Sequence, residues 1–412
     1  MFTPDRVAVI SYGTATLSGV NTYGGATTVG LMGISNAYLT VNHNQALGST
    51  SAGTTVNGGH TGFAFENKLF LGKDVTVAGE TLTLSSVSGG RAALHYNQSS
   101  GSGTWDGPIV LPSLSSDAYL WSDRSGGTLV LGSSSSDTIT GSNGTLTVRG
   151  AGMIVINSRL SLGTTLLTRN DPGGTCTINS TGNLWGRTGL AEGTLILGAS
   201  DALPPAAKLT LGKGMVAKAV LDLNGHSQQI GGLAESGIPG STQQILSSSP
   251  ATLVVSNTES NTFGANGSTI EGAVTLIKTG SGTLTLTGTN TTAGAFVVSN
   301  GTLAVSATGT FGVNCTNIVV GGTGTLALST SGAIADTAAV LMTARDIDTA
   351  KIQLDDGVSE SVGLLLYGTV SKPVGTYGAT GSGANHIDDT HFSGLGVLRV
   401  LHSTSGTIIR VR

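Results

Sequence analysis

The 412-residue chain contains 64 glycines, and only 10% of its residues are charged and 4% aromatic. No apolar run approaches the roughly 18 residues that a membrane helix needs, so we expect no membrane span. The net charge is −4 and lysine and arginine form no cluster, so nucleic acid is not expected as a partner.

The first residues, MFTPDRVAVISYG, lack the charged and apolar regions of a signal peptide. The segment Thr14–Val29 nevertheless has the sequence of the inside of a repeat. We therefore expect that a leader and earlier coils have been removed, or that the gene model starts late.

Short strands are predicted wherever apolar residues alternate with small polar ones. The predicted strands are Thr14–Ser18, Ala26–Val29, Ala37–Val41, Ala64–Leu71, Thr81–Val87, Thr128–Leu131, Thr145–Val148, Met153–Ile156, Thr175–Asn179, Val220–Leu223 and Leu253–Val255.

We interpret the proline-containing segment Gly101–Asp123 as a bulged coil or side loop, because proline interrupts ladder pairing. Arg169–Gly174 is predicted to be an irregular loop. Asp336–Arg345 is the best helix candidate, although Ala338–Met342 fits a strand as well.

The alternation of apolar and small polar residues is clearest in the stretch Gly280–Ser306. Two strands, Thr283–Thr287 and Thr302–Ser306, each begin with Gly-Thr-Leu, and a glycine- and asparagine-containing turn and the apolar piece Ala295–Val298 lie between them. Glycine supplies backbone conformations with positive φ at corners, and asparagine favours tight bends. One such unit cannot bury its apolar face alone, so it needs copies of itself above and below.

The tripeptide recurs along the chain, with spacings of 17, 19 and 23 residues where the copies are close. Its first residues are Gly127, Gly144, Gly193, Gly282, Gly301 and Gly324. A repeat of roughly 20 residues has the length of one solenoid coil. The spacing therefore predicts a parallel β-solenoid.

These segments resemble the autotransporter-associated β-strand repeat of bacterial secreted and surface proteins. Gly280–Val305 matches the whole unit, except that Thr291 and Thr292 stand where Thr-Tyr is usual, and Thr14–Val29 matches its middle. Leu221–Leu233 is similar to another element of these proteins. The resemblance implies export from a bacterium and a scaffold role, and it is specific for architecture rather than for an activity.

We expect a right-handed parallel β-helix of roughly twenty coils. Residues 1–330 are predicted to form the solenoid, and residues 331–412 a β-rich terminal module that caps it. The segment Gly375–Val400 resembles the module that ends such repeats. No C-terminal run of aromatic-flanked amphipathic strands occurs, so we expect no translocator barrel.

Few residues are candidates for chemistry. Enzymes on parallel β-helices need carboxylates on neighbouring coils, and the pairs Asp117/Asp137 and Asp336/Asp355 have that spacing. His226 fits a turn better than a catalytic base, with Asp222 and Asn224 beside it. The run from His386 to His391 fits a solvated loop better than a metal site. We therefore predict no catalytic residue, no cofactor-binding residue and no metal ligand.

Cys176 and Cys315 would lie about 30 Å apart along a solenoid, too far for a disulfide within the chain. They are interpreted as buried thiols, and an intermolecular bridge is the alternative.

The predicted function is that of a secreted, non-enzymatic structural or adhesive protein, either a rigid surface stalk or the subunit of an extracellular fibre. The alternatives are a polysaccharide lyase or hydrolase and a carbohydrate-binding protein, with Trp105 or Trp121 stacking on sugars. The expected partners are copies of the chain in a filament, and cell-surface glycans. In such a filament the Val7–Ile10 strand would add to Gly396–Leu401 or Thr407–Val411 of a neighbour. The alternative is that Met1–Tyr12 folds onto its own first coil.

Overall fold

Leucine, valine and isoleucine alternate with threonine, serine or alanine along most of the chain, which is the pattern of strands with one buried face. The computed structural model describes residues 6–10, 12–32, 36–58, 66–86, 90–112, 117–163, 166–306, 308–343 and 349–404, and its described residues form 40 strands and no helix. In β27 (Thr283–Leu286), Leu284 and Leu286 are fully buried while the threonines are half-exposed. The all-β prediction is confirmed.

The chain divides into two compact units. Unit 1 comprises Met1–Ala207 with Ala219–Leu221, and unit 2 comprises Lys208–Lys218 with Asp222–Arg412. The strand β21 (Lys218–Asp222) belongs in part to each.

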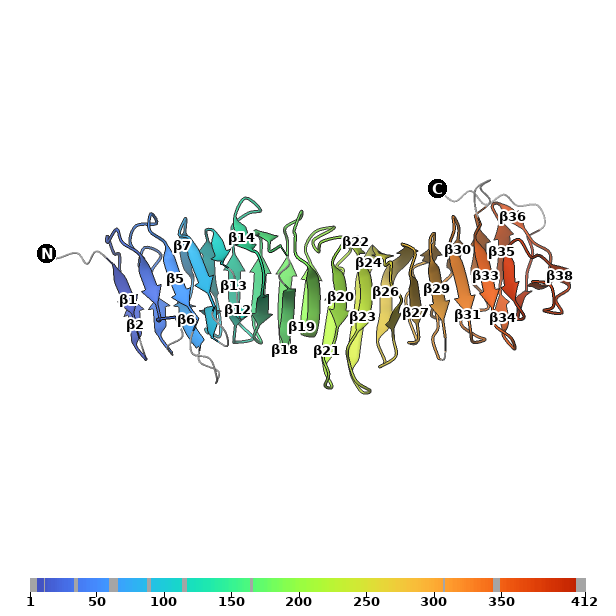
Figure 1. The fold of residues 1–412 in the computed structure, drawn as a ribbon, viewed down its shortest axis with the longest axis horizontal. Helices are drawn as coiled ribbons and strands as arrows, with labels where there is room; N and C mark the ends of the chain where they lie inside the picture. The colour runs from blue at the N-terminus through green and yellow to red at the C-terminus, as the bar shows by residue number, and fades with distance from the viewer. Residues whose placement is uncertain are drawn as a thin grey trace. The chain divides into compact units, whose positions relative to one another are not determined.

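Unit 1 has three sheet faces, on which the strands follow one another in chain order (Figure 1). The first face contains β1 (Val7–Val9), β3 (Thr27–Val29), β5 (Thr54–Asn57), β8 (Leu82–Ser85), β11 (Ile109–Leu111), β14 (Thr138–Gly141) and β17 (Arg159–Ser161). The second contains β2 (Thr14–Leu17), β4 (Tyr38–Val41), β6 (Glu66–Leu71), β9 (Arg91–Tyr96), β12 (Asp117–Ser122) and β15 (Thr145–Arg149). The third contains β7 (Val75–Ala78), β10 (Ser102–Asp106), β13 (Thr128–Leu131) and β16 (Met153–Ile156). The longer strands β18 (Leu166–Ile178) and β19 (Arg187–Leu197) run from the second face to the third.

Unit 2 repeats this plan. One face contains β20 (Lys208–Leu211) and β23 (Gly232–Glu235), and it continues as a six-stranded sheet. The strands of this sheet are β25 (Asn261–Phe263), β27, β29 (Thr302–Val305), β31 (Thr325–Leu328), β33 (Lys351–Leu354) and β39 (Phe392–Gly394). Another contains β22 (Gln228–Ile230), β24 (Thr242–Ser256), β26 (Thr269–Thr279), β28 (Phe296–Val298), β30 (Asn317–Val320), β32 (Ala339–Met342) and β35 (Leu364–Tyr367). The remaining strands are β34 (Ser359–Val362), β36 (Val370–Ser371), β37 (Gly375–Gly378), β38 (His386–Ile387) and β40 (Val397–Val400).

Both units are parallel β-solenoids, as predicted, with about 13 turns in all. The expected number of roughly twenty assumed turns of roughly 20 residues. Some turns are that short, since Thr283 pairs with Thr302, but Tyr38 pairs with Lys68, 30 residues on. Longer corners therefore account for the smaller number.

The glycine of the Gly-Thr-Leu tripeptide has a steric role. A Cβ atom on Gly282, Gly301 or Gly324 would lie 2.3, 2.4 or 2.7 Å from a carbonyl oxygen of the preceding coil. No side chain fits at such distances. In these coils a glycine precedes the strand because the neighbouring backbone passes directly beside it.

The asparagine of the repeat joins one coil to the next. Asn21 Nδ2 donates to Ala46 O at 2.7 Å, and Asn290 Nδ2 donates to Thr310 O at 2.6 Å. Asn290 Oδ1 also accepts from Ile270 N at 2.8 Å in the coil before. The side chain thus supplies hydrogen bonds to backbone groups of the coils before and after it.

Three local predictions need correction or completion. The described part of Gly101–Asp123, which leaves out residues 113–116, forms the strands β10, β11 and β12, and Pro108 and Pro112 lie outside these strands. The irregularity at Arg169–Gly174 is a register shift inside β18. The strand alternative for Ala338–Met342 is confirmed by β32, while Arg345 lies outside the described residues.

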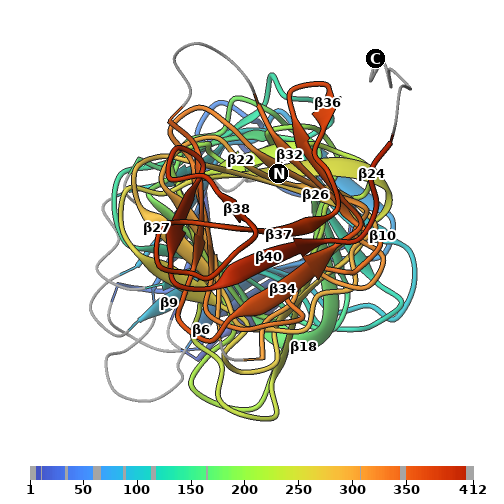
Figure 2. The same ribbon diagram turned by 90° about the vertical axis from the view of Figure 1, so that its right-hand side faces the viewer.

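The last strands close unit 2 (Figure 2). β40 pairs with β34 on one edge and, antiparallel, with β37 on the other, while β37 also pairs with β38. Ladder pairing continues from β33 to β39, and we call the strands from β36 to β38 the cap. The predicted domain boundary at residue 330 stays a prediction.

Candidate functional site

The most elaborate side-chain cluster lies on the outer surface of the second face of unit 1. In the ladder, Phe70 is opposite His95, His95 is opposite Trp121, and Trp121 is opposite Arg149. One residue of each of the strands β6, β9, β12 and β15 therefore occupies the same position on successive coils. We call these four residues the aromatic column.

The rings of the aromatic column stack along the solenoid axis. The ring centres of Phe70 and His95 are 4.7 Å apart, and those of His95 and Trp121 are 4.4 Å apart with an interplanar angle of 8°. The Arg149 guanidinium lies 4.3 Å from the centre of the Trp121 ring. These distances match the strand spacing of about 4.8 Å, so register alone brings the groups into contact.

Paired charges surround the column. Lys68 Nζ lies 4.5 Å from the Trp121 ring centre and 3.0 Å from Glu66 Oε2. Arg149 Nε lies 2.9 Å from Asp171 Oδ2. Both of these cations therefore have a carboxylate partner as well as an aromatic one.

His95 is the most deeply buried member, with 4% of its surface exposed and no hydrogen-bond partner at either ring nitrogen. Burial, together with the nearby cations Lys68, Arg149 and Arg124, lowers the pKa of His95 to about 3. The imidazole is therefore neutral near pH 7 and enclosed, so it acts as an aromatic packing group and not as a general base.

Neither Trp105 nor Trp121 presents a ring face to a sugar. Trp105 is fully buried and donates from Nε1 to Glu80 O at 3.1 Å. The two faces of Trp121 are covered by His95 and Arg149, which come from strands on opposite sides of β12. The interpretation of these residues as sugar-stacking groups is wrong.

The predicted carboxylate pairs do not face each other in the ladders. Asp117 begins β12 and is opposite Thr145, whereas Asp137 precedes β14 in another sheet. Asp336 and Asp355 likewise adjoin strands of different sheets, β32 and β33. Asp137 and Asp355 each accept a hydrogen bond from a nearby serine, Ser133 N and Ser329 Oγ respectively.

The run from His386 to His391 is an ordered turn that ties the cap to β35. Asp388 accepts hydrogen bonds from Tyr367 at 2.6 Å and from His391 Nδ1 at 2.9 Å, and these bonds lower the pKa of Asp388 although burial opposes them. His386 stacks on Tyr377 with ring centres 4.5 Å apart. Among the described residues, no group of three or more histidine, cysteine or acidic side chains is placed to hold a metal ion.

His226 lies in a turn, as predicted. Its backbone nitrogen donates to Leu223 O at 2.7 Å, and Asn224 N donates to Asp222 Oδ1 at 2.8 Å. Asn224 has a φ of 50°, in the left-handed region that asparagine tolerates.

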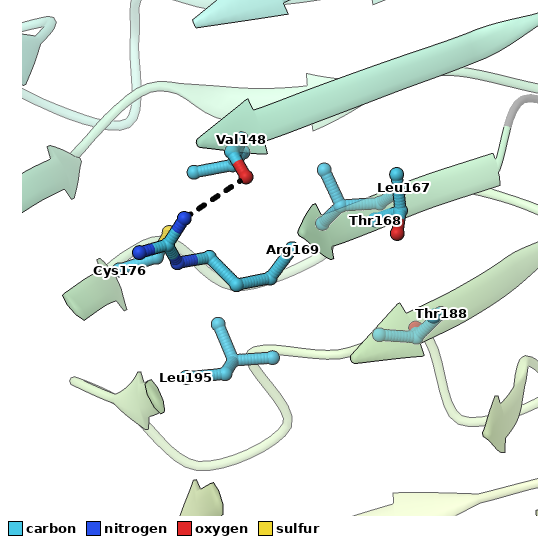
Figure 3. Close-up of a pocket in the computed structure, with 8 residues that line it drawn as sticks. Val148, Leu167, Thr168, Arg169, Cys176, Thr188 and Leu195 are labelled. Carbon is cyan, nitrogen blue, oxygen red and sulfur yellow. Dashed lines mark hydrogen bonds between the residues drawn. The ribbon is translucent and has the colours of Figure 1, made fainter. Parts of the chain in front are cut away.

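Both cysteines are buried free thiols, as predicted. Burial raises the pKa of Cys176 to about 12, although the nearby Arg169 opposes the shift. In Figure 3 the Arg169 guanidinium lies beside Cys176, and the dashed line marks the hydrogen bond that its Nη1 donates to Val148 O at 3.3 Å. Arg169 Nη2 donates to Gly150 O at 2.7 Å. The adjoining cavity measures only about 10 Å³, which is barely the size of one water molecule.

Sequence reasoning missed the buried charged groups. Arg169 is 3% exposed, and Lys278 and Glu360 are fully buried. Lys278 Nζ donates to Gly280 O at 2.8 Å and to Asn300 O at 3.3 Å, while Glu360 accepts from Ala333 N and Ile334 N. Only the coil register shows that these groups meet corner backbone, so no local pattern identifies them.

The passenger-associated-transport-repeat family matches the chain at residues 12–30 and 276–305. These are the segments around Asn21 and Asn290. No curated protein and no solved structure matches the chain. None of the described residues belongs to a helix long and apolar enough to cross a membrane. The matched repeats on a parallel β-solenoid fit a repeat protein of the autotransporter passenger type.

Proposed function

We propose that the chain is a secreted, non-enzymatic structural element of a bacterial surface protein, either a rigid stalk or the subunit of an extracellular fibre. The observation that carries this proposal is the continuous parallel register of each unit, with an apolar interior and corner hydrogen bonds between coils. A repeat of this kind extends a chain at constant cross-section. The passenger-type repeat supports a location outside the cell.

The hydrogen bonds of several polar groups support the same role. Asp388, Asp355 and Asp137 all accept hydrogen bonds that hold turns. His95 is enclosed in the aromatic column. These groups stabilise the coils, which is the use that a structural protein makes of them.

Immunogold electron microscopy of the native cells tests the proposal. We expect the protein in surface stalks or fibres that vanish when its gene is deleted. The enzyme alternative predicts turnover of an acidic or neutral polysaccharide that is lost in Asp137→Ala or Asp355→Ala. Saturable glycan binding without turnover would favour the carbohydrate-binding alternative, at residues other than Trp105 and Trp121.

We further propose that copies associate through the N-terminal end of unit 1. β1 pairs only with β3 and β2 only with β4, so each has an open edge among the described residues. Ile10 and Tyr12 beside these strands are 53% and 71% exposed. Open strand edges favour pairing with another chain.

The contact differs from the strand addition expected from the sequence. β1 already belongs to its own first coil, and β40 has a neighbour on both edges, while Met1–Asp5 and Thr407–Val411 lie outside the described residues. Two N-terminal ends related by a two-fold axis satisfy the open edges of both copies.

Analytical ultracentrifugation tests this association. The double variant Ile10→Glu, Tyr12→Glu places like charges at the contact, so we expect it to be monomeric where the unchanged protein is dimeric. Unchanged protein that stays monomeric at high concentration contradicts the proposal. The variant Val313→Glu, at an exposed position in unit 2, is the control.

A further inference from the structure

Two neighbouring loops of unit 2 project together. Residues 212–217 follow β20 and residues 236–241 follow β23, and these strands pair in parallel. Ser241 Oγ donates to Met215 O at 3.3 Å, and Thr242 N donates to Ala217 O at 3.0 Å. The yellow-green loops reach farthest at the lower edge of this part of Figures 1 and 2.

The ends of both loops are apolar and exposed. Met215 is 55% exposed, Val216 61% and Ile238 39%, and Pro239 beside them is also exposed. A Cβ atom on Gly240 would lie 3.8 Å from Val216 Cγ2, so the two loop ends are in contact. Single exposed apolar residues are ordinary on protein surfaces, but a cluster on adjoining projections marks an interaction site. We call Met215, Val216 and Ile238 the apolar tip.

Two lysines flank the apolar tip. Lys213 is half-exposed and Lys218 is exposed, and neither loop contains an aspartate or glutamate. The nearest acid along the chain, Glu235, lies at the base of the second loop and accepts hydrogen bonds from Asn266 N and Ser268 Oγ. The tip therefore combines apolar side chains with flanking cations.

Hydrogen bonds hold the two loops in place. Met215 N donates to Lys213 O at 2.6 Å, Ile238 N donates to Ser241 Oγ at 3.2 Å, and Asn266 Nδ2 donates to Gly237 O at 2.8 Å. A loop that is ordered in advance loses little conformational entropy on binding.

We propose that the apolar tip inserts into the surface of an anionic lipid membrane, with Lys213 and Lys218 beside the headgroups. Apolar side chains enter the boundary between headgroups and acyl chains, and basic residues near anionic lipid add binding energy. A stable protein partner needs a far larger surface than three side chains. A second copy bound through the same tips would bring these lysines toward their like-charged equivalents, which opposes that contact.

Co-flotation of the intact protein with lipid vesicles tests the proposal. Binding is expected to vesicles of phosphatidylcholine with phosphatidylglycerol, to weaken in high salt, and to be much lower with phosphatidylcholine alone. The double variant Lys213→Gln, Lys218→Gln should weaken binding about 25-fold, which corresponds to about 1 kcal/mol per lysine. The triple variant Met215→Ser, Val216→Ser, Ile238→Ser should weaken it by about tenfold or more.

Matched controls are available. Val313 is 81% exposed on another loop of unit 2, so Val313→Ser should bind as the unchanged protein does, and so should Lys73→Gln at an exposed lysine of unit 1. Circular dichroism verifies that each variant is folded. Equal binding to neutral vesicles, or full binding by the triple variant, overturns the proposal. A triple variant that loses self-association in the ultracentrifuge and keeps vesicle binding assigns the tip to a second copy instead, and also overturns it.

This inference is independent of the proposed structural role. A stalk or fibre needs no lipid contact. The flotation assay can therefore overturn the lipid proposal while the microscopy still supports the structural role, and the reverse.

Discussion

At the scale of single residues, buried ionisable groups make the protein sensitive to pH. The folded-state pKa of His95, about 3, lies below the value of about 6.5 in an unfolded chain. Between these values the unfolded chain binds a proton that the folded protein does not bind. Stability is therefore lost as the pH falls from about 6.5 toward 3, by up to about 1.4 kcal/mol per pH unit.

The variant His95→Phe keeps an aromatic ring in the column and removes this titration. Its unfolding free energy in urea should fall less between pH 7 and pH 4 than that of the unchanged protein. His402→Phe, at an exposed position, retains His95 and should show the full loss. If the unfolding free energy of His95→Phe fell as much between pH 7 and pH 4 as that of the unchanged protein, His95 would not be enclosed as described.

Lys278 has an effect of the same sign at alkaline pH. Burial lowers the pKa of Lys278 to about 8, below its value of about 10.4 in an unfolded chain. The unfolded state then holds more protons between these values, so stability due to this group rises with pH from about 8 to 10.4. Lys278→Met should abolish this rise in urea unfolding curves, whereas Lys73→Gln, at an exposed position, should retain it.

At the scale of elements, the corner asparagine is the part of the repeat that joins coils. Asn290→Ala leaves Ile270 N and Thr310 O without their side-chain partner in a buried corner. We expect a loss of about 2–5 kcal/mol in unfolding free energy, since each unsatisfied buried group costs about 1–3 kcal/mol. Asn300→Ala truncates an exposed side chain and is the control. Its unfolding free energy, measured by urea denaturation like that of Asn290→Ala, should change by less than about 0.5 kcal/mol.

The sequence alone predicts the strands whose pattern of apolar and polar residues lies within a few neighbouring positions. The alternation in Thr283–Leu286 and Thr302–Val305 predicts strands because burial alternates with each residue. Pro108 and Pro112 misled because a proline at a corner and a proline in a ladder have the same local sequence. The aromatic column was not foreseen, since Phe70, His95 and Trp121 meet only once the coil length is known.

At the scale of the whole molecule, the two ends of the described chain differ. β1 and β2 have open edges, whereas β37 covers the outer edge of β40. Tyr377 anchors this cover, being 4% exposed, stacked on His386 and hydrogen-bonded to Pro373 O at 2.9 Å.

Tyr377→Ala should loosen β37 and expose the edge of β40. We expect concentration-dependent association in light scattering that exceeds that of the unchanged protein, because an open strand edge pairs with other chains. Val374→Ala lies just before the same strand and truncates an exposed side chain, so it should behave like the unchanged protein. Association that does not increase in Tyr377→Ala would mean that the edge stays covered without this anchor.

The register between successive coils also bears on how such a chain changes length during evolution. Thr283 is opposite Thr302 and Thr302 is opposite Thr325, with leucine following threonine each time. Excision of the segment from Thr283 to Gly301 would leave Thr302 to occupy the vacated position, with the same inward leucine pattern. Duplication of that segment would add one coil and leave the register of the other coils unchanged. A gene that encodes this architecture can thus lengthen or shorten its product in discrete steps of one coil.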